Sequence, residues 1–199
     1  MIAPVGDVAT TPKRGMALWV YVLAIVAVLV VVAEVELAMG REPICTCGFV
    51  SLWHGAVDSQ NSQQVSDWYT LTHVEHGLGF YALLFLLARR LPMPLRLLLA
   101  VGLEGAWEIV ENSPFIIDRY RTATVSLDYY GDSVVNSVAD VVAMMGGFWM
   151  ARRLPVWGTV AFIVVVELLL ALTIRDNLAL NILMLIHPID AIKQWQLGA

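Results

Sequence analysis

The sequence has few charged residues and only two cysteines. Asp, Glu, Lys and Arg make up 15% of its 199 residues, whereas hydrophobic residues make up 59%. A soluble domain of this length carries more charge and fewer unbroken apolar runs, so a separate soluble module is excluded. Two cysteines are too few for a disulfide framework. The net charge of -5 and the lack of a basic patch argue against nucleic-acid binding.

The two cysteines stand in the stretch CTC, where a single threonine separates Cys45 from Cys47. A disulfide between cysteines this close in the chain would be strained, because the bond demands a specific separation of the two backbones. Two unbridged thiols or a soft-metal pair, with His54 close by in the sequence, are the alternatives to such a bond, and the spacing leaves the redox state of the two cysteines open.

Long apolar runs are the main feature that is present. A membrane-spanning helix needs about 20 mostly apolar residues. We interpret five segments as spans: 16–38, 69–91, 95–112, 134–150 and 156–174. A sixth apolar segment, 177–189, is too short for a comfortable crossing. The predicted fold is all-α: a single polytopic membrane helix bundle over residues 1–199, with five transmembrane helices plus a short C-terminal interfacial or half-spanning helix.

Basic residues predict the orientation of the spans. They lie before the first span, between the second and third, and between the fourth and fifth: Lys13, Arg14, Arg89, Arg90, Arg96, Arg152 and Arg153. Segments rich in Lys and Arg stay in the cytoplasm. We therefore expect a cytoplasmic N-terminal tail (1–15) and two outer loops, 40–66 and 113–133. Both loops are rich in aromatic residues, which indicates folded caps at the membrane surface.

Three consecutive spans carry polar residues at helical spacing near the outer side. The sets are three or four residues apart: His73 and His76; Glu104, Glu108 and Glu111; Asp132, Asn136 and Asp140. Residues at this spacing share one face of a helix. Carboxylates are costly in hydrocarbon, and several on one face repel one another unless protons, cations or a metal neutralise them. We therefore expect one polar pocket that opens to the outer side.

Histidine and carboxylate ligands suit Zn, Mn or Fe, and carboxylate-rich metal sites occur in helix bundles. The residues predicted to hold a divalent metal are His73, His76, Glu104 and Glu108. The candidate catalytic groups are Glu108, Glu111 and Asp132, with a glutamate as general base. The candidate substrate-binding groups are Arg119, Arg121 and Asn136, since arginine grips anionic headgroups bidentately.

Simpler interpretations stand beside these for each residue. The histidines could bond lipid headgroups or loop carbonyls, and Glu104 could be protonated and bonded across helices. Asp132 could be the N-cap of the fourth span, since GDSVVNS is a good helix start. Trp107 and Tyr129 fit an outer aromatic belt. Glu167, in the fifth span, is expected to pack against another polar group or to face a partner subunit.

Three stretches resemble the domain-of-unknown-function 2585 family: CTCGFVSLWHG, NSQQVSDWYTLTHVEHGLGFY and LEGAWEIVENSPFIIDRYRTATVSLDYYGDSVVNSVAD. The resemblance implies a small, multi-pass protein of the bacterial inner (cytoplasmic) membrane, so the outer loops would be periplasmic. Gln64 departs from the pattern, which has a histidine there. A weaker similarity to VanZ-like membrane proteins covers Glu104, Glu108, Arg119, Asp132 and Asn136. Neither resemblance implies a reaction.

Three functions fit the predicted pocket. The first is a metal-assisted hydrolase or transferase acting on a membrane lipid or lipid-linked substrate. The second is a non-catalytic accessory subunit, with a protein partner in a membrane complex. The third is a small proton-coupled transporter, which is ranked last because the inner halves of the second and third spans are apolar from Leu83 to Leu87 and from Leu97 to Val101.

Overall fold

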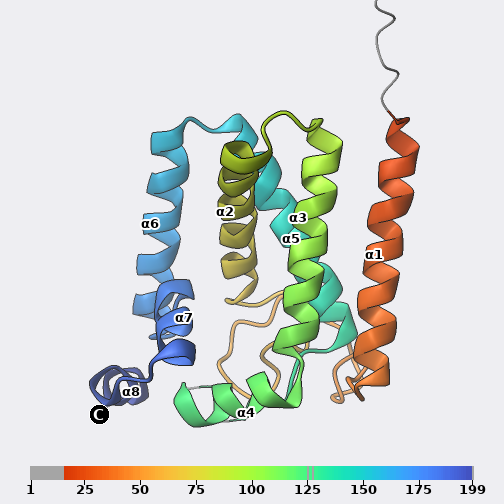
Figure 1. Ribbon diagram of the computed structural model, residues 1–199. Coiled ribbons are helices and arrows are strands. Elements are labelled where there is room, and N and C mark those ends of the chain that lie inside the picture. Colours follow the sequence, from red (N-terminus) through yellow and green to blue (C-terminus); the bar gives the residue numbers. More distant parts are fainter. Residues whose placement is uncertain (1–15, 125, 127, 199) are drawn as a thin grey trace, which may run out of the picture.

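The fold is all-α, as the sequence predicts. A computed structural model describes residues 16–124, 126 and 128–198, and this part of the chain contains helices and no strand (Figure 1). The helices are α1 (Leu18–Ala38), α2 (Thr70–Ala88), α3 (Met93–Glu111), α4 (Pro114–Ala123), α5 (Val134–Arg153), α6 (Val156–Thr173), α7 (Leu178–Ile186) and α8 (Asp190–Leu197).

Helices α1, α2, α5 and α6 are each long and apolar enough to cross a membrane. Helix α3 has the same 19-residue length as α2 but carries Arg96, Glu104, Glu108 and Glu111, and it is not among these four. The predicted membrane character is therefore supported by four helices, and the fifth span stays a prediction.

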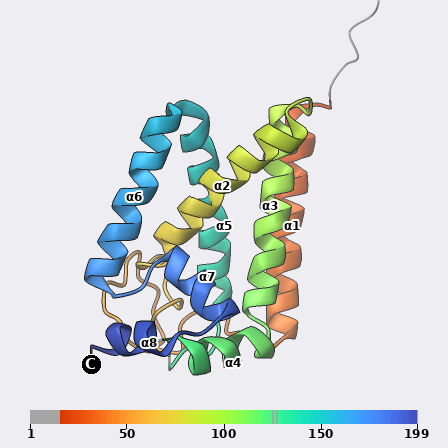
Figure 2. The same ribbon diagram turned by 60° about the vertical axis from the view of Figure 1, so that its left-hand side comes forward.

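The two ends of the bundle differ. The α2–α3 and α5–α6 turns lie at one end, and the long 39–69 segment, α4, α7 and α8 lie at the other (Figures 1 and 2). Arg89, Arg90, Arg152 and Arg153 consequently share one end, in agreement with the predicted charge pattern. Lys13 and Arg14 lie outside the described residues.

Helix α4 was not predicted as a helix; the sequence indicated only a folded cap over 113–133. The Ser113 side chain accepts a hydrogen bond from Ile116 N, and Pro114 occupies the first helical position. Both are typical of a helix start, because a serine N-cap satisfies a free N–H and proline needs no partner there.

Helices α2 and α5 pack at a backbone contact through two glycines. A Cβ atom on Gly77 would collide with the Met144 carbonyl, and a Cβ on Gly147 would collide with the Val74 carbonyl. Small residues allow such close approach between helices in a membrane. On α2, His73 lies four residues before Gly77, so the contact also directs His73 toward α5.

A second contact places α1 against α3. A Cβ on Gly105 would lie 2.8 Å from Val32 Cγ2, so the α1 side chain fills the space that the glycine leaves. Toward the arginine-rich end, the helices enclose an apolar core of Leu84, Leu97, Ala100, Val101, Val141, Met144 and Phe148. This core packs the half of the bundle that the sequence predicted to be apolar.

The sixth apolar segment forms α7, which at nine residues is too short to span a membrane. The Glu167 carboxylate accepts hydrogen bonds from Leu178 N at 2.9 Å and Ala179 N at 3.2 Å, so it satisfies the free N–H groups at the start of α7. Glu167 therefore packs against a polar group of its own chain, which was one of the two predicted roles.

Asp176 joins three parts of this end. Its carboxylate accepts hydrogen bonds from Tyr69 at the start of α2, Asn181 of α7 and Gln196 of α8, at 3.0–3.3 Å. The side chain is fully buried. Burial raises the pKa of Asp176 from its ordinary 3.8 to about 6, although these hydrogen bonds partly offset the rise.

We predict that Gly147→Ala destabilises the bundle, because its methyl group would force α2 and α5 apart. Overpacking of this kind costs about 1–3 kcal/mol. Thermal unfolding in detergent measures the loss. Gly146→Ala is the matched control, since a Cβ there meets no atom within 4 Å. Equal unfolding temperatures for the two variants would contradict the proposed contact.

We predict that the stability difference between the wild type and Asp176→Asn depends on pH. The raised pKa means that the folded protein holds the proton more tightly, so the wild type loses stability as pH rises from about 3.8 to about 6. That difference corresponds to about 3 kcal/mol. Unfolding curves of both proteins across this range test it, and a difference that stays constant with pH would refute it.

Candidate functional site

Two histidines of α2 converge on one glutamate of α3. His73 Nδ1 lies 2.7 Å from Glu104 Oε1, and His76 Nδ1 lies 3.0 Å and 3.1 Å from the two oxygens of the same carboxylate. Glu104 is fully buried. Residues predicted from two separate spans therefore meet in one cluster, and the nearest partner of both histidines is a carboxylate of the same chain.

More carboxylates surround His73. Glu108 Oε1 lies 3.4 Å from His73 Nδ1, and Asp140 Oδ2 of α5 lies 3.8 Å from His73 Nε2. Among the described residues, neither oxygen of Glu108 accepts a hydrogen bond, and neither does Asp140 Oδ1. Buried oxygens without a partner are rare in proteins, so the cluster has unused capacity to bind a proton or a cation.

Two overlapping groups of side chains could hold a metal ion. One is His73, His76 and Glu104, and the other is His73, Glu108 and Glu111; within each group the ligand atoms lie within 4.8 Å of one another. Zn–N and Zn–O bonds of about 2.1 Å in a tetrahedron separate neighbouring ligand atoms by about 3.4 Å. His73 Nδ1 and Glu108 Oε1 are 3.4 Å apart, which matches that value, whereas the 2.7 Å and 3.0 Å contacts of Glu104 are direct hydrogen bonds that would lengthen around an ion.

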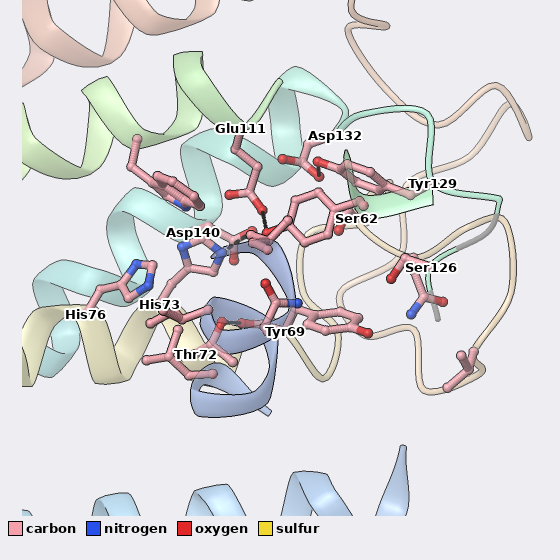
Figure 3. A pocket seen from close by; sticks show the side chains of 18 of the residues that line it. Ser62, Tyr69, Thr72, His73, His76, Glu111, Ser126, Tyr129, Asp132 and Asp140 are labelled. Carbon is pink, nitrogen blue, oxygen red and sulfur yellow. Dashed lines mark hydrogen bonds and ion pairs between the residues drawn. The ribbon is translucent and has the colours of Figure 1, made fainter. Parts of the chain in front are cut away.

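The cluster borders a pocket of about 430 Å³ (Figure 3). Its polar lining comes from α2, α3, α4, α5, α7 and the outer loops: Asp58, Ser59, Asn61, Ser62, Tyr69, Thr72, His73, His76, Glu111, Tyr120, Ser126, Asp128, Tyr129, Asp132, Asp140 and Asn181. Its apolar lining comprises Val57, Phe80, Trp107, Leu178, Ile182 and Leu185. A pocket that pairs an acidic wall with an apolar wall suits an amphipathic ligand.

Glu111 and Asp132 face this pocket and each is held by a tyrosine. Tyr120 OH donates to Glu111 Oε1 at 2.7 Å, and Tyr129 OH donates to Asp132 Oδ1 at 3.0 Å (Figure 3). Asn112 Nδ2 donates to Asp132 Oδ2 at 2.9 Å. Burial raises the pKa of Asp132, and the hydrogen bonds from Asn112 and Tyr129 oppose that rise. Burial likewise raises the pKa of both tyrosines, so they remain neutral donors.

The first outer loop is fixed over the pocket by buried amides. Gln63 Nε2 donates to Gly131 O at 2.6 Å, Ser133 Oγ donates to Gln63 O at 3.0 Å, and Asn136 Nδ2 donates to Gln64 O at 2.9 Å. These bonds join the 40–66 loop to the start of α5. Both outer loops are thus folded caps, as predicted.

The interpretation of Asp132 as a helix cap is wrong. Ser133 is the N-cap of α5, because its side chain accepts from Asn136 N, and Asp132 is free to line the pocket. Trp107 and Tyr129, which fit an aromatic belt by sequence, line the same pocket, and their place in a belt stays a prediction. The sequence does not distinguish an aromatic residue at the membrane surface from one in a pocket wall. Asp140, in contrast, could be found from the sequence, because it lies at helical spacing from Asp132.

The arginines predicted to bind substrate lie outside this pocket. Arg119 Nε donates to the Leu185 carbonyl at 2.8 Å, which ties α4 to α7, and Arg119 borders a second pocket of about 160 Å³. Arg121 lies exposed on α4. Neither arginine, nor Asn136, is part of the lining of the larger pocket. Substrate binding by these three residues stays a prediction.

The structure decides between the alternatives that the sequence left open for the two cysteines. Cys45 and Cys47 form a disulfide, with Cα atoms 5.1 Å apart. That separation falls within the range that disulfides normally bridge, so the short spacing along the chain does not prevent the bond. His54 instead pairs with Asp58, at 2.9 Å.

The helices and the buried cluster define a membrane-type, all-α protein with a histidine–carboxylate pocket. The chain belongs to the family described as "Protein of unknown function (DUF2585)", whose model matches residues 36–198. It is 50% identical over 190 residues to a UPF0314 protein of Sinorhizobium fredii, covering 95% of this chain and 96% of the relative. A UPF0314 protein of Paracoccus denitrificans is 54% identical over 185 residues, covering 92% and 94%. No solved structure matches the chain.

We predict that Asn136→Ala loosens the 40–66 loop. The variant leaves the buried Gln64 carbonyl without its donor, which costs about 1–3 kcal/mol. Limited proteolysis in detergent should cleave this loop several-fold faster than in the wild type. Asn181→Ala is the control, because Asn181 bonds Asp176 and not the loop. Unchanged cleavage in Asn136→Ala would show that the loop does not depend on this bond.

Proposed function

We propose that the protein is a metal-dependent enzyme of the bacterial inner membrane, a hydrolase or transferase that acts on a membrane lipid or lipid-linked substrate at the periplasmic surface. The observation that carries the proposal is the convergence of His73, His76 and Glu104 beside a pocket with one acidic and one apolar wall. His73, His76, Glu104 and Glu108 would hold a divalent Zn, Mn or Fe ion.

The charge balance of the site favours a metal. Five buried or half-buried carboxyl groups lie near two imidazoles: Glu104, Glu108, Glu111, Asp132 and Asp140. Two imidazoles cannot neutralise five carboxylates, so the site needs protons or a cation. The unpartnered oxygens of Glu108 point to the cation, because an ion would supply the partner that the described side chains lack.

The pocket supports an amphipathic substrate. Phe80, Trp107 and Ile182 would pack against an acyl or isoprenoid chain, while the metal would polarise the ester or phosphoryl group. Without a bound cation, the acidic wall would repel an anionic headgroup.

Glu111 is the proposed general base. It lines the pocket, and Tyr120 holds one of its oxygens while the other accepts no hydrogen bond from the described residues. That free oxygen would take the proton from the attacking water or hydroxyl group. Asp132 faces the same space and is proposed to orient the nucleophile, and Glu108 would complete the metal site.

The proposed topology has five spans, namely α1, α2, α3, α5 and α6. The N-terminus would lie in the cytoplasm. The carboxylates of α3 face buried partners on α2, which reduces the cost of carrying them into the membrane. The end that holds Arg89, Arg90, Arg152 and Arg153 would then be cytoplasmic.

The apolar core argues against the proton-coupled transporter. Val101, Met144 and Phe148 are fully buried between the pocket and the arginine-rich end. A path for protons or solutes would have to cross this packed apolar layer.

We predict that the protein purified in detergent binds one divalent ion per chain, and that His76→Ala and Glu104→Gln each weaken this binding at least tenfold. Each variant removes one ligand of the group formed by His73, His76 and Glu104, and unchanged affinity in both would favour the group of His73, Glu108 and Glu111. Isothermal titration with Zn²⁺ and Mn²⁺ measures the affinity. His187→Ala is the control, since this exposed histidine lies at the end of α7, outside the cluster.

A second measurement separates catalysis from metal storage or assembly. Glu111→Gln should retain the metal and lose turnover of a lipid extract, followed by mass spectrometry of lipids. A wild-type protein that binds no metal would overturn the proposed enzyme. A metal-loaded protein that changes no lipid, and that copurifies with a fixed partner, would favour the accessory subunit.

A further inference from the structure

The two sulfur atoms of the Cys45–Cys47 disulfide differ in their access to solvent. Cys45 is buried, with 2% of its surface exposed, whereas Cys47 is exposed. A thiolate in solution would therefore reach Cys47 Sγ first. This disulfide belongs to the 40–66 loop and neither cysteine lines the pocket proposed for lipids.

Each sulfur also receives a hydrogen bond from an N–H group. Cys47 N lies 3.2 Å from Cys45 Sγ, and Gln64 Nε2 lies 3.3 Å from Cys47 Sγ. Donors of this kind stabilise a thiolate more than a neutral sulfur, because the hydrogen bond to the charged form is stronger. Both leaving groups of a disulfide exchange are therefore provided with a donor.

Gln64 is held so that its donor faces the sulfur. Ser51 N donates to Gln64 Oε1 at 2.6 Å, which fixes the amide with Nε2 toward Cys47. The Nε2 group also donates to Gln60 Oε1 at 3.2 Å. The side chain is 1% exposed, so the donor is a fixed part of the loop and not a mobile surface group.

We propose that Cys45 and Cys47 form a redox-active pair that oxidises a dithiol polypeptide. Exposed apolar side chains flank the disulfide, with Ile44 39%, Phe49 53% and Val50 48% exposed. An extended polypeptide could cover these side chains, whereas a small hydrophilic thiol could not. The substrate class is therefore a polypeptide with two neighbouring cysteines.

The exchange proceeds in two balanced steps. A substrate thiolate bonds to Cys47 Sγ while the Cys45–Cys47 bond breaks, and the electron pair leaves on Cys45 Sγ beside the Cys47 N–H. The second substrate thiolate then attacks the first substrate sulfur, which releases Cys47 as a thiolate beside Gln64 Nε2. The substrate loses two electrons and two protons and gains a disulfide; the pair gains both and becomes a dithiol.

The test uses the full-length protein in detergent and a synthetic peptide with two cysteines. Alkylation followed by mass spectrometry should detect one peptide disulfide for each Cys45–Cys47 pair reduced. With a single-cysteine peptide activated as its thionitrobenzoate disulfide, Cys45→Ser should trap the peptide as a mixed disulfide on Cys47, because no second thiol is present to resolve it, and Cys47→Ser should trap none. The proposal is overturned if excess peptide leaves the native pair oxidised, or if the two variants trap the peptide equally.

Gln64 provides an independent readout. Gln64→Ala and Gln64→Glu both remove the donor, and loss of one hydrogen bond should slow peptide release about fivefold. Gln64→Glu retains the acceptor for Ser51 N, so it preserves the loop if the alanine variant unfolds. Gln63→Ala is the control, because Gln63 Nε2 bonds Gly131 and not a sulfur. Unchanged release in both Gln64 variants would refute the role of this donor.

Discussion

The close backbone contact between α2 and α5 determines the geometry of the whole site. Gly77 and Gly147 bring the two helices to a separation that no side chain would permit. His73 precedes Gly77 by one turn, and Asp140 precedes Gly147 by two turns. The glycine contact therefore places His73 within 3.8 Å of Asp140. The same face of α2 reaches the glutamates of α3.

Much of this arrangement could be predicted from periodicity. The limits of α1, α2, α3, α5 and α6 follow from apolar runs, and the stripes on the second, third and fourth spans do share one site. Helical spacing fixes which residues share a face, and the cost of burying charge in hydrocarbon makes those faces turn toward one another. The two constraints together were sufficient to join residues that lie 31 positions apart in the chain, as His73 and Glu104 do.

The remainder depends on tertiary contacts that leave no periodic signal. Helix α4 is a 10-residue polar helix, so neither length nor hydropathy marks it. Arg119 looked like a headgroup ligand, yet the fold gives it the carbonyls of α7. Tyr120 and Tyr129 support Glu111 and Asp132 from the second outer loop, and the sequence alone does not reveal which carboxylate a loop tyrosine reaches. The Cys45–Cys47 bond stayed open at the level of the sequence because chain spacing is a poor guide to the separation of backbones.

The polar contacts gather at one end of the bundle. Toward the outer end, buried amides such as Gln63, Gln64 and Asn136 bond backbone groups, which supplies hydrogen-bond partners to the irregular loops that cover the polar cavity. Toward the other end, Val101 and Met144 belong to an apolar core. Any ion or proton that neutralises the acidic cluster would therefore enter from the looped end. The proposed substrate would present its reacting group to the cluster and keep its apolar part against Phe80 and Trp107.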